Sequence, residues 1–321
     1  MKPPYTLTHE ILNLCTEITL LLGKYEGLPL PVPQPELRKH NRIRTIQSSL
    51  AIEGNTLTIE QVTDIINNKR VIGPSKDILE VKNAIKAYEN LSRYKVGELD
   101  SLLLAHKTLM HGLIQEAGKL RSSNVGVRKG EKVIHMAPNY TQVPKLMEDL
   151  FLFLKKEKDS HPLIKSSAFH YELEFIHPFI DGNGRIGRLW QSAILYNYRS
   201  IFEYVPIESV IRKKQAEYYE CLHECDKAGE STIFIKFILT AIKEAVIEFA
   251  KQVRPQRQST SSRVNIAKEK FGKKPFTRKD YLETHGNIST ATASRDLAMA
   301  VSKKMLKKIG DKAITMYQFI E

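Results

Sequence analysis

The sequence has few cysteines, a single tryptophan and no long apolar run. Its three cysteines, Cys15, Cys221 and Cys225, are an odd and scattered set. They indicate a reducing compartment, because a disulfide framework needs paired cysteines. No apolar stretch approaches the roughly 18–20 residues of a membrane-spanning helix. The first residues also lack the apolar segment of a signal peptide. These absences predict a cytoplasmic protein without a membrane partner.

The positive charge of the chain is unevenly distributed. The 321 residues, of which 42% are hydrophobic, are typical of a globular protein with two domains. The net charge is +13, and residues 251–321 hold 16 Lys and Arg against 6 Asp and Glu, which gives +10. The preceding 250 residues therefore carry only +3. This asymmetry predicts a polyanionic partner for the C-terminal region alone.

Helical spacing of apolar residues dominates the first 250 residues, so the fold class is predicted to be mainly α. The prolines of residues 28–35 predict an extended linker, because proline lacks the amide donor that a helix needs. Between residues 118 and 140, valine and isoleucine occur among glycines and predict a short β-hairpin. The predicted helices cover about residues 6–24, 36–52, 59–68, 78–94, 99–113, 143–156, 162–175, 183 to beyond 195, 208–227 and 231–253.

The basic C-terminal region has a different pattern. Residues 254–263 are polar and predict a linker. Helices are predicted over 264–271, 278–285 and 289–301, followed by two strands around a turn at residues 310–311. Helix–turn–helix followed by a hairpin is typical of a winged helix. Residues 290–297 are then the recognition helix. Its predicted contacts to DNA are Thr292, Ser294 and Arg295. A winged helix used for protein contacts or dimerisation is the alternative.

Chemically active residues are densest in the segment 177–188, HPFIDGNGRIGR. Its glycines let the backbone approach a ligand closely, and the helix N-terminus that follows them favours an anion. Arg185 and Arg188 are three residues apart and can hold different phosphates of one ligand. Asp181 suits Mg²⁺, and His177 suits a general base. The pattern predicts attack of a hydroxyl on a nucleotide phosphate. An ordinary capped turn with solvated arginines is the alternative, which the coincidence of these residue types disfavours.

The same segment resembles the signature HPFx(D/E)GNGRxxR of Fic-domain proteins, with every defined position filled. The resemblance implies a helical Fic core that transfers AMP from ATP to a Ser, Thr or Tyr hydroxyl of a target protein, with Mg²⁺. It implies that His177 deprotonates this hydroxyl, that Asp181 helps to bind Mg²⁺ and that Arg188 meets the γ-phosphate. Relatives that phosphorylate their targets carry lysine where this chain has a glycine, which favours nucleotidyl transfer. The implied anion hole for the other phosphates consists of Gly182, Asn183, Gly184 and Arg185.

A second resemblance lies at residues 49–55, SLAIEGN, which are similar to the family's inhibitory motif (S/T)xxxE(G/N)N. It implies that Glu53 pairs with Arg188, within a motif that also contains Ser49 and Asn55. A carboxylate on this arginine opposes ATP, whose phosphates bring negative charge to the same guanidinium. By itself, Glu-Gly-Asn is an ordinary helix stop. Next to a complete Fic signature it predicts autoinhibition within the chain.

The predicted hairpin lies where the family has a flap, and the resemblance implies that it binds the target by strand pairing. The flap residues concerned are Lys132, Val133, Ile134, His135 and Met136. A plain connector is the alternative. Tyr218 or Tyr219 is a further candidate for contact with adenine, although aromatic residues on a helix more often belong to the core.

Together these features predict an autoinhibited protein adenylyltransferase with a C-terminal winged helix. The expected parts are an N-terminal helical region over 1–110 with its inhibitory helix at about 36–55, a catalytic region over 111–253, a linker over 254–263 and the winged helix over 264–321. A target protein is the expected partner, and DNA and a second copy of the chain are further candidates. Two alternatives stay open: a DNA-binding regulator whose Fic core senses a nucleotide, and a related chemistry such as removal of AMP or transfer of another phosphate-linked group.

Overall fold

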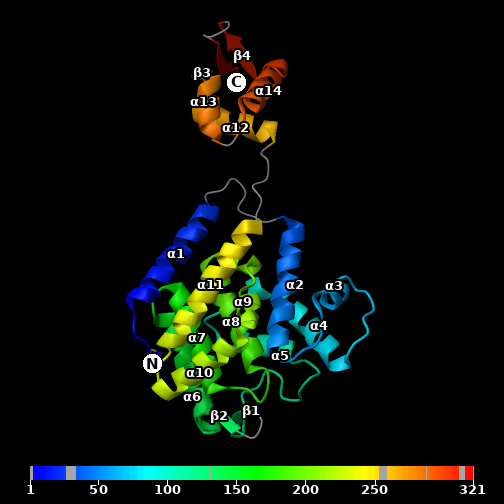
Figure 1. Ribbon diagram of the computed structural model, residues 1–321, viewed down its shortest axis with the longest axis vertical. Helices are drawn as coiled ribbons and strands as arrows, with labels where there is room; N and C mark the ends of the chain where they lie inside the picture. Colours follow the sequence, from blue (N-terminus) through cyan, green and yellow to red (C-terminus); the bar gives the residue numbers. More distant parts are fainter. Residues whose placement is uncertain are drawn as a thin grey trace. The chain divides into compact units, whose positions relative to one another are not determined.

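The computed structural model describes residues 3–26, 34–129, 132–252, 259–286, 288–310 and 315–320, without the side chains of 25–26 and 127–136. The chain forms two compact units, Met1–Arg254 and Pro255–Glu321. Helices make up most of both units, which confirms the predicted mainly α class (Figure 1). No helix in the described ranges is long and apolar enough to cross a membrane.

The first unit is a helical bundle with one hairpin (Figure 1). Its predicted linker 28–35 lies almost entirely outside the described residues. Its elements are α1 His9–Glu26, α2 Pro35–Ile52, α3 Ile59–Ile66, α4 Ser75–Glu89, η1 Leu91–Arg93, α5 Leu99–Leu109, β1 Gly126–Lys129, β2 Lys132–Met136, η2 Tyr140–Gln142, α6 Val143–Lys156, α7 Pro162–Ile176, α8 Asn183–Tyr198, η3 Ser200–Tyr204, α9 Ile207–Lys213, α10 Gln215–Ala228 and α11 Thr232–Gln252.

The centre of this unit is the pair α7 and α8, whose residues are mostly buried. The two helices pack closely at Gly187. A Cβ atom there would lie 2.8 Å from Oε1 of Glu174 and 3.0 Å from Cδ2 of His170. α2 packs against α9 and α4, and its C-terminal end reaches α8. The connection from α7 to α8 therefore lies beside the end of α2.

One long helix was predicted over 208–227, and this prediction is wrong. The backbone leaves the helical conformation at Lys214, where φ is −111° and ψ is 31°, so that α9 ends and α10 begins. The side-chain amide of Gln215 donates to the carbonyl of Ile52 over 2.9 Å, which places the start of α10 beside the end of α2. A helix that is interrupted at one residue keeps almost the same spacing of apolar residues, so this spacing does not reveal the interruption.

The described part of the second unit contains three helices and a three-stranded antiparallel sheet of order β3-β5-β4. α12 begins inside the predicted linker 254–263, because the Ser259 hydroxyl caps it by accepting from the amide of Ser262. Part of that linker, 254–258, lies outside the described residues. β3 was not predicted, because a strand of two residues is too short to show the alternation of apolar and polar residues that marks a strand. The elements are α12 Thr260–Phe271, β3 Phe276–Thr277, α13 Arg278–His285, α14 Thr290–Ser302, β4 Leu306–Ile309 and β5 Met316–Phe319.

Candidate active site

His177 ends α7 in a left-handed backbone conformation, with φ of 50° and ψ of 59°. Such a conformation is costly for a residue other than glycine and needs support from its surroundings. The amide of His177 donates to the carbonyl of Leu173 over 3.0 Å. Its ring Nδ1 lies 3.3 Å from the carbonyl of Glu174. The backbone thus turns the histidine out of the helix, and its side chain lines a pocket beside α8.

Arg121 holds the segment around His177 in place. This buried side chain donates from Nε to the carbonyl of His177 over 2.8 Å, and its backbone amide donates to the carbonyl of Pro178 over 2.9 Å. Its other nitrogens donate to the carbonyls of Ser123 and Pro138, on either side of the hairpin. Burial lowers the pKa of Arg121. Arg121 is absent from the predicted site residues, because a lone arginine ahead of a hairpin belongs to no motif.

Two further side chains fix the loop between α7 and α8. Asn183 exchanges hydrogen bonds with the amide and carbonyl of Phe179, both at 2.9 Å, so its side chain closes the loop. His106 accepts at Nδ1 from the amide of Gly118 and must carry its proton on Nε2, which donates to the carbonyl of Asp181 over 2.9 Å. Burial lowers the pKa of His106 to about 4, so it stays neutral. His106 also went unpredicted, because nothing in its local sequence marks it.

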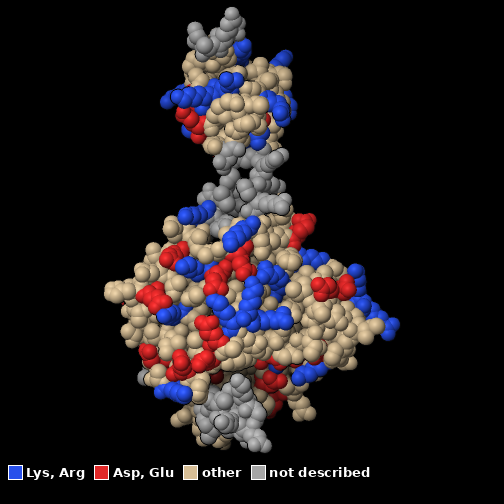
Figure 2. Space-filling model, viewed as in Figure 1, with Lys and Arg blue, Asp and Glu red and all other residues tan. Residues whose placement is uncertain are grey.

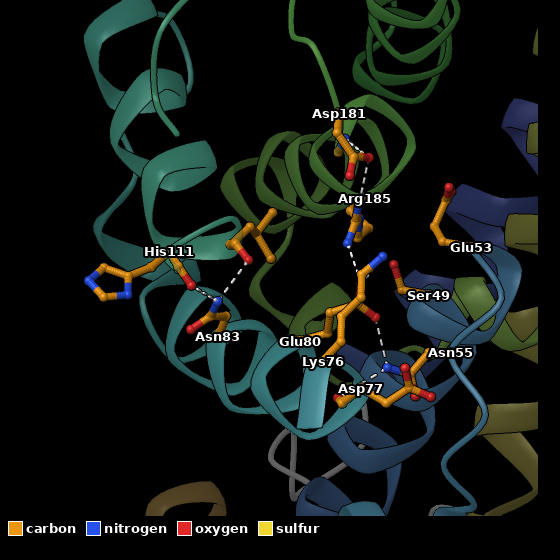
Figure 3. A network of polar contacts seen from close by, with 12 residues as sticks. Ser49, Glu53, Asn55, Lys76, Asp77, Glu80, Asn83, His111, Asp181 and Arg185 are labelled. Carbon is orange, nitrogen blue, oxygen red and sulfur yellow. Dashed lines mark hydrogen bonds and ion pairs between the residues drawn. The ribbon is translucent and has the colours of Figure 1, made fainter. Parts of the chain in front are cut away.

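The predicted metal residue and the first motif arginine contact each other (Figure 3). The carboxylate of Asp181 is half-exposed, and its Oδ1 accepts from Nη2 of Arg185 over 2.7 Å and from the amide of Gly182 over 2.6 Å. Nη1 of Arg185 donates to Oε1 of Glu80, on α4, over 2.9 Å. Arg185 is buried and does not line the pocket that contains His177. Two carboxylates therefore hold the guanidinium that was predicted to bind phosphate.

The second motif arginine contacts the predicted inhibitory motif. Nη2 of Arg188 donates to Oε1 of Glu53 over 2.7 Å and to the carbonyl of Ser49 over 3.0 Å, and Nε donates to the Ser49 hydroxyl over 3.1 Å. Burial acts to lower the pKa of Arg188, but the nearby negative charges, Glu53 foremost, raise it overall. Nη1 of Arg188 is buried and has no hydrogen-bond partner among the described residues. The structure thus brings Ser49, Glu53 and Arg188 together.

A pocket of ≈ 170 Å³ lies over the first turn of α8. At Gly184 a Cβ atom would lie only 2.3 Å from Oε1 of Glu53. The Glu53 carboxylate therefore occupies the position at the helix N-terminus that suits an anion. Both Tyr218 and Tyr219 line this pocket, but Tyr218 is buried and its hydroxyl contacts His170, whereas Tyr219 is exposed.

The predicted hairpin is confirmed in its backbone. β1 and β2 pair antiparallel, with an irregularity between Val127 and Arg128. The side chains of the predicted flap residues 132–136 lie outside the described part. β2 contacts α10, and residues of α10 line the pocket. The backbone of the hairpin is therefore close to the pocket that holds His177.

Asp181 is the side chain that fits Mg²⁺ in this region. In the described ranges no group of three or more His, Cys, Asp or Glu could hold a metal ion by itself. Mg²⁺ bound to a nucleotide commonly takes one or two carboxylates and completes its shell with phosphate and water oxygens. A single, half-exposed carboxylate at the start of α8 matches this donor set.

The predicted DNA-contacting residues lie on the first half of α14. Arg295 is exposed, while Ser294 accepts from Arg278 over 3.1 Å. The hydroxyl of Thr292 lies 3.0 Å from that of Ser289, which caps the helix. The exposed lysines nearby flank or lie on β4, and Figure 2 shows Lys and Arg spread over the visible face of this unit. These lysines are Lys303, Lys304, Lys307 and Lys308.

Comparison with known proteins agrees with this geometry. The family model described as Fic/DOC family matches residues 97–195. A Fic family protein from Desulfovibrio desulfuricans G20 of known crystal structure is 40% identical, with a TM-score of 0.76, over 99% of this chain and 98% of that chain. Fic-1 from C. elegans, at 22% identity and a TM-score of 0.63 over 75% of this chain and 72% of that chain, shares the fold.

Curated relatives named protein adenylyltransferase Fic are more distant. The one from Nematostella vectensis is 31% identical over 67% of this chain and 50% of its own length. The one from Drosophila persimilis is 32% identical over 63% of this chain and 39% of its own length. The chain thus spans half or less of these relatives. The family model and the nearly full-length likeness to the Desulfovibrio protein establish that the chain belongs to the Fic/DOC family.

Proposed function

We propose that the chain is a protein adenylyltransferase that transfers AMP from ATP to a hydroxyl side chain of a target protein. One observation carries the proposal: a single pocket holds His177, the N-terminal turn of α8 and the guanidinium of Arg188. A base, an anion-binding helix end and an arginine are what attack of a hydroxyl on a phosphate requires. The curated relatives named as adenylyltransferases support the same reaction.

The residues have distinct roles in this reaction. With Nδ1 directed to the carbonyl of Glu174, the other ring nitrogen of His177 takes the proton of the target hydroxyl. The hydroxyl oxygen then bonds to the α-phosphorus, the bond from that phosphorus to the bridging oxygen breaks, and pyrophosphate leaves. Gly184 lets phosphates approach the backbone of α8, and Arg188 binds the terminal phosphate. Asp181 would hold Mg²⁺ on the protein side, and the bound ion would supply positive charge to offset that of the phosphates.

We further propose that Glu53 inhibits this reaction from within the chain. Its carboxylate lies on Arg188 and against Gly184, in the space that the phosphates need. A charge-assisted hydrogen bond of this kind is worth about 1.5–3 kcal/mol. That energy corresponds to roughly 10- to 100-fold in nucleotide affinity. Removal of the Glu53 carboxylate is therefore expected to activate the protein by about this factor.

The test uses Glu53→Gly protein with α-labelled ATP, Mg²⁺ and a cell lysate as the source of targets. We expect label on protein at a rate about 10- to 100-fold above the unsubstituted chain, and none in Glu53→Gly/His177→Ala. Glu36→Gly, on the first turn of the same helix, is the matched control and should leave the rate unchanged. Absence of label on every protein would refute the proposal. Release of AMP from a labelled target would instead favour the reverse chemistry.

For the C-terminal unit we propose a winged helix that binds DNA. The supporting observation is its arrangement: three helices precede the β4–β5 hairpin, and β3 adds to the same sheet. Exposed Arg295 and the four lysines around β4 supply the positive charge that the DNA backbone attracts. Binding to a second protein is the competing use of this unit, and a mobility-shift series over salt concentration separates the two.

A further inference from the structure

Each arginine of the motif is held by a carboxylate from outside the motif. Glu53 holds Arg188, and this contact is part of the proposed autoinhibition. Arg185 is held by Glu80, which lies on α4 and belongs to neither the motif nor the inhibitory segment. Figure 3 shows the resulting chain of contacts, from Asp181 through Arg185 to Glu80 and on to Asn55. Glu80 therefore links Arg185 of the motif to Asn55 of the predicted inhibitory segment.

Glu80 is buried, and both its oxygens are in use. Oε1 accepts from Nη1 of Arg185 over 2.9 Å, and Oε2 accepts from Nδ2 of Asn55 over 2.8 Å. Lys76 approaches Oε1 only to 4.0 Å. Asn55 is itself fixed, because it also donates to the carbonyl of Asp77 and accepts from the amide of Leu57. The orientation of the Glu80 carboxylate is therefore determined on both sides.

We propose that Glu80 is a positioning residue that sets the affinity of the site for the metal–nucleotide complex. It balances the charge of Arg185 and so leaves the carboxylate of Asp181 available to the metal ion. The inference rests on the proposed function, because it concerns the metal ion that accompanies ATP. It adds a role for a residue on α4 that neither sequence motif contains.

The physical basis is competition for the carboxylate of Asp181. In the described structure Arg185 shares its charge between Asp181 and Glu80. A metal ion that binds Asp181 competes with Arg185 and repels its positive charge. With Glu80 present, the buried guanidinium keeps a counter-ion. Without Glu80, metal binding would leave a buried and uncompensated charge, which is strongly unfavourable. Loss of the Glu80 charge must therefore weaken metal binding.

The hydrogen bond from Asn55 explains how Glu80, on a different helix from Arg185, stays directed toward that arginine. Asn55 follows the C-terminal end of α2 and holds the oxygen of Glu80 that Arg185 does not use. The carboxylate therefore cannot rotate away from Arg185 without giving up this hydrogen bond. A residue behind a metal ligand typically changes metal affinity by about 10- to 100-fold when it is lost. We expect an effect of this size for Glu80.

The test measures binding of Mn²⁺, a paramagnetic substitute for Mg²⁺, by electron paramagnetic resonance with a non-hydrolysable ATP analogue. Glu53→Gly serves as the parent so that the nucleotide can enter. Added to this parent, Glu80→Gln is expected to weaken Mn²⁺ binding at least about tenfold. Glu80→Asp keeps the charge at a longer distance and should lose less affinity than Glu80→Gln. Glu89→Gln, at the other end of α4, is the matched control and should bind as the parent does.

A second measurement separates this role from a merely structural one. Nucleotide affinity in the presence of EDTA should be the same in parent and Glu80 variants to within about twofold, because Glu80 does not line the pocket. An equal loss with and without metal, or no loss in either variant, would overturn the inference. If Glu80→Gln does not fold, the comparison of Mn²⁺ binding is made between the parent and Glu80→Asp. If the parent itself binds no nucleotide, the proposed function fails and not this inference alone.

Discussion

At the scale of single residues, the site depends on side chains that hold others in place. His177 has the conformation of a helix end, and its backbone is tied by Leu173 and Arg121. Asn183 closes the loop that follows it. These contacts are made to backbone groups of the segment, so they determine where the histidine lies without touching its ring. A motif in the sequence predicts His177 as the base, but the residues that hold its backbone are spread along the chain.

Burial lowers the pKa of His106 from 6.5 to about 4 in the folded protein, so this residue links stability to pH. In the unfolded chain His106 takes up a proton near pH 6.5, whereas the folded protein resists this until about pH 4. Its contribution to stability is therefore complete above about pH 6.5 and is lost progressively as the pH falls toward 4. The full contribution is on the order of 3 kcal/mol, at 1.36 kcal/mol per pKa unit.

Urea unfolding between pH 4.5 and 7.5 checks this, comparing the unsubstituted chain with His106→Gln. The variant should be less stable at neutral pH, and its free energy of unfolding should depend less steeply on pH in this window. The exposed His111, replaced by glutamine, is the control and should keep the original slope. An unchanged slope in His106→Gln would show that other groups cause the pH dependence.

At the scale of elements, the end of α7 and the hairpin β1–β2 are joined by Arg121. Its guanidinium contacts the carbonyls of Ile176 and His177 at the end of the helix, and those of Ser123 and Pro138 beside the hairpin. A cation at the C-terminal end of a helix also interacts favourably with the helix dipole. The hairpin and His177 therefore share one support.

We expect Arg121→Met to reduce kcat by about 100-fold, because misplacement of a catalytic group by an ångström can cost that much. The KM for ATP should change less than about threefold, since Arg121 does not line the pocket. Steady-state labelling in the Glu53→Gly background measures both constants. The exposed Lys119, two residues earlier, is the matched control as Lys119→Met. An unchanged kcat, or a rise in KM alone, would contradict this role.

Helix bounds show where the sequence pattern suffices. α6 was predicted at its observed bounds, and α13 likewise, because a terminal proline or a capping box marks their starts. The interruption at Lys214 was missed, and α12 begins earlier than predicted. In both cases hydrogen bonds with specific partners decide the boundary, and the spacing of apolar residues does not report them.

At the scale of the whole molecule, the net positive charge is divided unevenly between the two units. The first unit carries the pocket, and the second carries most of the net positive charge. We expect the full chain to bind duplex DNA with an affinity that falls steeply with salt, since log K changes by about −0.9 per phosphate contact. A mobility-shift series over salt concentration measures this slope.

Replacing the four lysines at positions 303, 304, 307 and 308 by glutamine should flatten the slope by about three to four units if each contacts a phosphate. The same change at Lys155 and Lys156, in the first unit, is the control and should leave the slope unaltered. No binding at low salt would favour a protein partner for this unit.

The sequence by itself determined the family, the mainly α class and the residues of both motifs, because these are local patterns with a fixed spacing. The contact between Glu53 and Arg188 was also implied by resemblance, and the structure brings the two residues within 2.7 Å. The tertiary structure alone placed Arg121, His106 and Glu80 in the site, since each is far in sequence from the group it holds. It also showed Arg185 buried between two carboxylates instead of facing the pocket. Spacing along one helix predicts which residues share a face, but the partners of that face come from other helices, and only their packing decides which contacts form.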